Sequence, residues 1–169
     1  MARKVFYSFC YEDDINRIMM IRNHWIINEE QNIFGVISKA EFEKINKNGR
    51  QEVYDWIDKQ LEDTSVTVVL IGSNTLNREF VKYEIQKSIQ QGNAIIGVYI
   101  HNIKDMLTLS TSIKGNVHTS IGYNDDGSPM YFDQICNNIY DYVEDEGYMN
   151  LGIWIENALN KKGKYVHWL

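Results

Sequence analysis

Hydrophobic residues form short, nearly continuous runs at residues 5–10, 65–71 and 94–100. These runs are rich in aromatic and β-branched side chains, so the pattern predicts three β-strands. The run at 65–71 is almost wholly apolar, as is typical of a parallel strand covered on both faces. We therefore expect this strand to lie near the centre of a sheet.

Three further segments repeat their hydrophobic residues with helical spacing, and they lie at residues 13–28, 50–62 and 78–91. Acidic residues at 12–14 suit the N-terminus of the first helix, and Gly92 with Asn93 ends the third. A strand, a helix and a strand in succession predict a right-handed βαβ unit. The expected fold class is therefore α/β, with a central, mostly parallel sheet flanked by helices on both faces.

The remaining segments carry weaker patterns. Residues 29–48 show no clean period, and residues 101–131 combine Gly, Asn, Asp and Ser in what we expect to be a long loop or an inserted irregular segment. Helical spacing in 132–146 and 151–159 predicts C-terminal helices within 132–160. Because neither a repeat nor a linker interrupts the chain, we expect residues 1–169 to form a single domain.

Composition narrows the classes of function. The 169 residues include 17 Lys or Arg and 23 Asp or Glu, which gives a formal net charge of −6. Such an acidic balance lacks the basic surface of a nucleic-acid-binding protein, so we expect no nucleic-acid partner. No apolar stretch approaches the roughly 18 residues of a membrane span, and the N-terminus does not resemble a signal peptide. We therefore expect a cytoplasmic protein with no membrane partner.

The motifs of several common enzyme classes are missing. The chain contains no phosphate-binding loop, dinucleotide fingerprint, zinc signature or nucleophile elbow. Its four histidines are scattered along the sequence. We therefore expect no metal site.

Glu84 is the residue that departs most clearly from its surroundings. In the helix predicted at 78–91 it falls in the apolar arc that contains Val81 and Ile85. A carboxylate against apolar surface costs free energy unless it is paired, and such groups concentrate at functional sites. The start of this helix also lies where ligands bind in parallel sheets. Two interpretations stay open, a functional carboxylate or a buried salt bridge to Arg22 or Arg78.

Two blocks of the sequence resemble the TIR-like proteins of bacterial Thoeris anti-phage systems. The first block comprises residues 4–9, Tyr11, Arg17 and residues 21–25, and the second comprises residues 64–73, Arg78, residues 81–85 and residues 92–97. A weaker match runs from residue 140 to Trp154. Their joint order makes the resemblance fairly specific, although each block alone is a weak signal.

The resemblance implies a flavodoxin-like TIR fold that consumes NAD⁺, with Glu84 as the catalytic residue. Family members of this type convert NAD⁺ to nicotinamide and a cyclic isomer of ADP-ribose, which activates a separate effector protein. NAD⁺ is then the substrate, no cofactor is expected, and TIR enzymes often form homo-oligomers on activation. The residues expected to contact the substrate are Ser8, Phe9, Tyr11, Arg22, Asn23, Trp25 and Ser73.

Within this set, the aromatic side chains Phe9, Tyr11 and Trp25 suit stacking and the exclusion of water. Arg22 or Arg17 suits the binding of the diphosphate or the holding of Glu84. A non-catalytic TIR-fold interaction module, with Glu84 as a structural acid, is the alternative. Receptor-type scaffolding is disfavoured because Pro129 is the only proline, so the proline-containing signalling loop of receptor TIR domains is missing.

Overall fold

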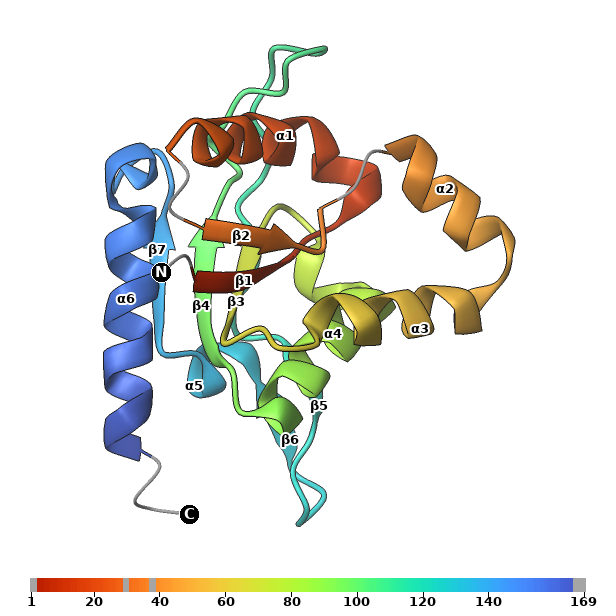
Figure 1. Cartoon of the computed structure of the whole chain (residues 1–169), viewed down its shortest axis with the longest axis vertical. Coiled ribbons are helices and arrows are strands. Elements are labelled where there is room, and N and C mark those ends of the chain that lie inside the picture. The colour runs from red at the N-terminus through yellow and green to blue at the C-terminus, as the bar shows by residue number, and fades with distance from the viewer. Residues whose placement is uncertain (1–2, 29–30, 37–38, 166–169) are drawn as a thin grey trace.

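The computed structural model describes residues 3–28, 31–36 and 39–165 and shows an α/β fold around a five-stranded sheet (Figure 1). Neighbouring strands are all parallel, in the spatial order β2-β1-β3-β4-β7. These strands are β1 (Arg3–Ser8), β2 (Gln31–Phe34), β3 (Val66–Ile71), β4 (Ala94–Tyr99) and β7 (Asn138–Asp141). This is the strand order of flavodoxin-like folds, so the predicted fold class is confirmed.

Helices cover both faces of the sheet. They include α1 (Tyr11–Asn28), α2 (Lys39–Lys47), α3 (Arg50–Leu61), α4 (Glu79–Gln91) and α6 (Gly147–Tyr165). The apolar residues of α1 and α6 pack on one face, and those of α3 and α4 pack on the other. Figure 1 shows α6 and the pair α3 and α4 on opposite sides of the strands. Among the described helices, none combines the length and apolar character needed to cross a membrane.

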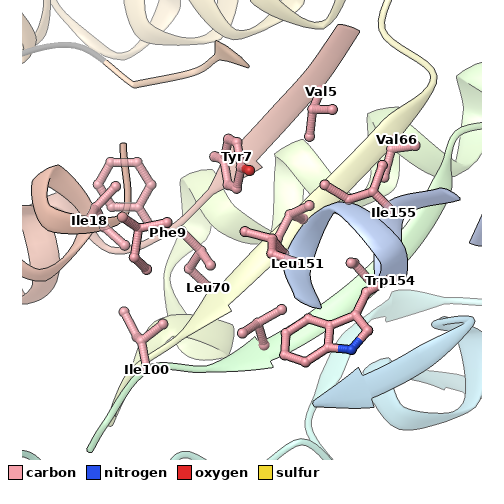
Figure 2. Close-up of a cluster of buried hydrophobic side chains, with 14 of the residues drawn as sticks. Val5, Tyr7, Phe9, Ile18, Val66, Leu70, Ile100, Leu151, Trp154 and Ile155 are labelled. Atoms are coloured by element: carbon pink, nitrogen blue, oxygen red, sulfur yellow. The ribbon is translucent and has the colours of Figure 1, made fainter. Parts of the chain in front are cut away.

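The alternation of side chains along the strands builds a separate core on each face. In β1, Val5 and Tyr7 join the cluster beneath α1 and α6, whereas Phe6 joins the cluster beneath α3. Figure 2 shows the first cluster, in which Leu151 of α6 lies over the strands. All six residues of β3 are buried, which confirms its predicted central position.

The predicted helix over residues 132–146 is wrong. Only Phe132–Ile135 is helical (α5), and the chain then forms β7, which pairs with β4. The backbone N–H of Asn137 donates to the Ile95 carbonyl at 2.7 Å, and its side-chain oxygen accepts from the Ile95 N–H at 2.9 Å. This pairing at the sheet edge outweighs a local hydrophobic spacing that imitates a helix. The second C-terminal helix exists as α6 and is longer than the predicted 151–159.

Other elements were not expected from the sequence. The segment 29–48 contains β2 and α2, and the segment 101–131 contains an antiparallel hairpin of β5 (Ser120–Tyr123) and β6 (Pro129–Tyr131). Each of these strands has four residues or fewer, and α2 has nine, of which few are apolar. Elements this short carry too few periods for a hydrophobic pattern to identify them.

The packing of α6 predicts a sharp difference between two neighbouring positions. Leu151 is fully buried, whereas Ile153 of the same helix is 57% exposed. Leu151→Ala should lower the free energy of unfolding by roughly 2–5 kcal/mol because it leaves a cavity, while Ile153→Ala should change it by less than about 0.5 kcal/mol. Urea denaturation followed by circular dichroism measures both values, and equal losses would contradict this packing.

Candidate active site

Glu84 reaches its position through the turn that follows β3. The chain leaves β3, forms a 3₁₀ turn at η1 (Thr75–Asn77), passes through the extended residue Arg78 and enters α4. Glu84 then lies on the inward face of α4, with only 6% of its surface exposed. The predicted burial of this carboxyl group is confirmed.

Ser8 is the polar partner of Glu84. It is the last residue of β1, is fully buried, and donates a hydrogen bond from its hydroxyl to Glu84 Oε2. Burial raises the pKa of the Glu84 carboxyl from an ordinary 4.5 to about 8, and the Ser8 hydrogen bond lowers the pKa by a smaller amount. A pKa of about 8 means that the carboxyl group is largely protonated at neutral pH.

The structure does not support a buried salt bridge at Glu84. Arg78 pairs instead with Glu12 and Asp13, at 3.4 and 3.5 Å. Within the described part of the chain, no ion pair joins Glu84 to Arg22 or to any other basic residue. The functional interpretation of Glu84 is therefore the one that the contacts favour.

Glu84 lines a cleft of about 500 Å³, open solvent at its mouth included. The cleft is bordered by the start of α1 and by α2, α3 and α4, beyond the carboxyl end of β1. It lies next to the point where the strand order reverses between β1 and β3, which is the usual ligand position in such folds.

The walls of the cleft are mainly aromatic and aliphatic. The apolar and aromatic lining residues are Phe9, Tyr11, Phe42, Val53, Trp56, Ile57, Phe80 and Val81. Tyr11 is held in place, because its hydroxyl donates to the Gly35 carbonyl at 2.7 Å and its ring stacks on Phe42 at 4.3 Å. The polar lining residues are Cys10, Glu12, Asn46, Arg78 and Glu84.

The structure brings together some of the predicted site residues. Ser8 contacts Glu84, and Phe9 and Tyr11 line the cleft beside it. Arg22, Asn23 and Ser73 do not line this cleft. Arg22 is half-buried and Asn23 exposed on the later part of α1, and Ser73 is exposed in the turn after β3. The side chain of Trp25 lies outside the described residues, and substrate contacts by these four residues stay predictions.

Arg17 does not reach the cleft because its guanidinium is used elsewhere. Its Nε donates to the Ile103 carbonyl at 2.7 Å, its Nη2 donates to the Ser110 carbonyl at 2.9 Å, and its Nη1 pairs with Asp14 at 3.0 Å. These bonds tie the start of α1 to the segment that follows β4. Arg17 therefore positions α1, which carries the cleft residues Tyr11 and Glu12.

Sequence reasoning missed the contribution of α2 and α3 to the cleft. Phe42 and Asn46 come from a helix that the pattern did not identify. Trp56 lies in the helix predicted at residues 50–62, but no sequence signal separated a core side chain from a cleft side chain. Across the described residues, no group of three or more His, Cys, Asp or Glu side chains could hold a metal ion.

The arrangement suits the stabilisation of positive charge. A single carboxyl group lies against apolar walls, where water competes little for its charge once it ionises. A cation that develops beside Glu84 would therefore interact with it much more strongly than in water. The cleft provides this chemistry with residues from four helices and one strand end.

The raised pKa of Glu84 predicts a pH dependence of stability. Because the folded state holds this proton more tightly than the unfolded state, the contribution of Glu84 to stability falls as pH rises from about 4.5 to about 8, by at most about 1.4 kcal/mol per pH unit. Glu84→Gln removes this pH dependence. As pH rises, the free energy of unfolding of Glu84→Gln should therefore increase relative to that of the wild type. Urea denaturation at several pH values across this range measures the change in this difference.

Replacement of the exposed residue Glu62 by Gln is the matched control for this measurement. It makes the same chemical change at an exposed side chain, so it is the reference for the change in Glu84→Gln. If the difference between Glu84→Gln and the wild type did not change with pH, the raised pKa of Glu84 would be contradicted.

Comparison with known proteins identifies the family of this chain. The family model described as "Thoeris protein ThsB, TIR-like domain" matches residues 6–105, a range that includes Ser8 and Glu84. A Bacillus cereus (strain MSX-D12) protein with the name "Putative cyclic ADP-D-ribose synthase ThsB1" is 34% identical over 191 residues, which cover 92% of this chain and 100% of that protein. The chain therefore belongs to the ThsB family of TIR-like proteins of the Thoeris system.

Proposed function

We propose that this protein cleaves NAD⁺, releases nicotinamide and closes the remaining ADP-ribose into a cyclic isomer. The observation that carries the proposal is the buried Glu84 carboxyl group, held by Ser8 in the wall of an aromatic cleft. The name of the Bacillus cereus relative supports the same reaction class. The family to which the chain belongs supports a role for the product in anti-phage defence.

The reaction needs one well-placed carboxylate. When the bond between the nicotinamide nitrogen and the ribose breaks, its electron pair leaves with neutral nicotinamide, so no general acid is required. The ribose gains oxocarbenium character, which an ionised Glu84 stabilises. A nucleophilic atom of the same ADP-ribose then bonds to the ribose carbon and loses its proton to solvent, so that NAD⁺ yields nicotinamide, the cyclic isomer and one proton.

The walls of the cleft favour cyclisation over hydrolysis. Phe9, Trp56 and Phe80 line the cleft together with Glu84, and their apolar surface limits the access of water to the oxocarbenium carbon. A folded ADP-ribose in this space keeps its own nucleophile close to that carbon. NAD⁺ serves as the substrate, and the proposed chemistry uses no further cofactor.

The proposal extends to the setting of the reaction. The cyclic product acts as a signal that a separate effector protein senses, and copies of the chain associate into a homo-oligomer on activation. The protein works in the cytoplasm, where NAD⁺ is available. Family membership supports these statements.

Glu84→Gln tests the reaction directly. The amide keeps the size of the side chain and removes the charge, so the release of nicotinamide and of any ADP-ribose isomer should fall by at least about 100-fold. Chromatography with mass detection on protein incubated with NAD⁺, and on lysates of phage-infected cells, measures both products. Glu62→Gln is the control and should keep full activity. If Glu84→Gln released both products as fast as an active wild type, Glu84 would not be the catalytic residue. If the wild type stayed silent in both preparations, the interaction module would be favoured.

The hydrogen bond from Ser8 to Glu84 predicts how the activity depends on pH. Because ionised Glu84 is the active form, kcat/KM for NAD⁺ should rise with pH up to about 8. Ser8→Ala removes a hydrogen bond that lowers the Glu84 pKa, so the midpoint of this rise should move to higher pH. A pH–rate profile for both proteins measures the shift. An activity loss in Ser8→Ala of the same size at every pH would contradict this role.

A further inference from the structure

The diphosphate of NAD⁺ carries two negative charges that must be matched when the substrate enters the cleft. Of the described residues that line the cleft, Arg78 is the only one with a positively charged side chain. It lies at the start of α4, the helix that carries Glu84. The cation and the carboxyl group are therefore fixed to the same element.

The other arginines near the site are used elsewhere. The guanidinium of Arg17 is taken up by Asp14 and by two carbonyl groups of the segment after β4. Arg50 pairs with Glu79 on the surface and lies outside the cleft lining, as does Arg22. Arg78 is therefore a better candidate for binding the diphosphate than Arg17 or Arg22, the two arginines expected from the sequence.

The hydrogen bonding of Arg78 is incomplete. Its Nη2 approaches Glu12 at 3.4 Å and Asp13 at 3.5 Å, distances that are long for charge-assisted hydrogen bonds. Its Nε is buried and has no acceptor among the described residues. A buried donor without an acceptor costs free energy, and a turn of the side chain that brings this donor to an acceptor on a ligand recovers it. A guanidinium matches phosphate oxygens with two parallel N–H bonds.

We propose that Arg78 binds the diphosphate of NAD⁺ and thereby places the nicotinamide ribose against Glu84. This inference rests on the proposed function, because it takes NAD⁺ as the occupant of the cleft. Glu12 then opposes the substrate, since its carboxylate pairs with Arg78 and lines the same cleft. Arg78 must leave Glu12 to bind the diphosphate, so the competition between these two partners sets the affinity for NAD⁺.

The test measures binding in protein that cannot consume the ligand. NMR titration of NAD⁺ and of nicotinamide riboside, which lacks the diphosphate, is carried out on Glu84→Gln and on the double variant that adds Arg78→Gln. The added change should weaken NAD⁺ binding at least about tenfold and leave nicotinamide riboside binding within about twofold. Adding Arg50→Gln instead is the matched control and should leave both ligands unchanged.

Two further variants separate contact with the ligand from a structural role. Arg78→Lys should recover part of the affinity for NAD⁺, because it keeps the charge but not the fork of donors. Glu12→Gln should tighten NAD⁺ binding, because it removes a competing carboxylate. A loss in Glu12→Gln similar to that in Arg78→Gln would show that the ion pair only holds the two helices together, and it would overturn the proposal.

Other results of these measurements also test the proposed role of Arg78. Equal weakening of both ligands by Arg78→Gln, or no NAD⁺ binding to Glu84→Gln, overturns the role of Arg78. In the otherwise unmodified protein, Arg78→Gln should raise KM for NAD⁺ with little change in kcat. If binding depends on Arg78 as expected while the wild type cleaves no NAD⁺, Arg78 stands as the diphosphate-binding residue and the proposed reaction fails.

Discussion

Removal of the Glu84 carboxyl group from water is the constraint on which the rest of the site depends. An ionised carboxylate in apolar surroundings is costly, so the protein gives it one hydrogen bond from Ser8 and otherwise holds it protonated near neutral pH. A full salt bridge would have satisfied the charge in advance. By giving the carboxyl group a single hydrogen bond and no ion pair, the fold keeps it available for a cation, as the proposed reaction requires.

The sheet makes this arrangement possible. Because β1 pairs with β2 on one side and β3 on the other, the chain leaves the two central strands in opposite directions and opens a crevice beyond their carboxyl ends. The start of α1 approaches the turn after β3 closely: a Cβ at Gly72 would lie 2.1 Å from Asp14 Oδ2, so a larger residue would displace the Asp14 side chain. This contact and the bonds of Arg17 position the start of α1, which carries Tyr11.

The long helices and strands could be predicted from the sequence. The one acidic residue within an apolar helical face, Glu84, could be predicted as well. Continuous apolar runs identified β3 and β4, and an acid within an apolar helical arc identified Glu84. The cleft wall could not be predicted, because Phe42 belongs to a short helix and Trp56 follows the same pattern as core residues. The helix expected at 132–146 failed because strand pairing with β4 is a long-range interaction, which local spacing does not report.

The outer strands of the sheet limit how copies of this chain can associate. β2 and β7 are the two edges, and each has only four residues. Short edges expose few free backbone N–H and C=O groups, so they are poor templates for adding a strand from another molecule. A filament built by continuing the five-stranded sheet from copy to copy is therefore disfavoured.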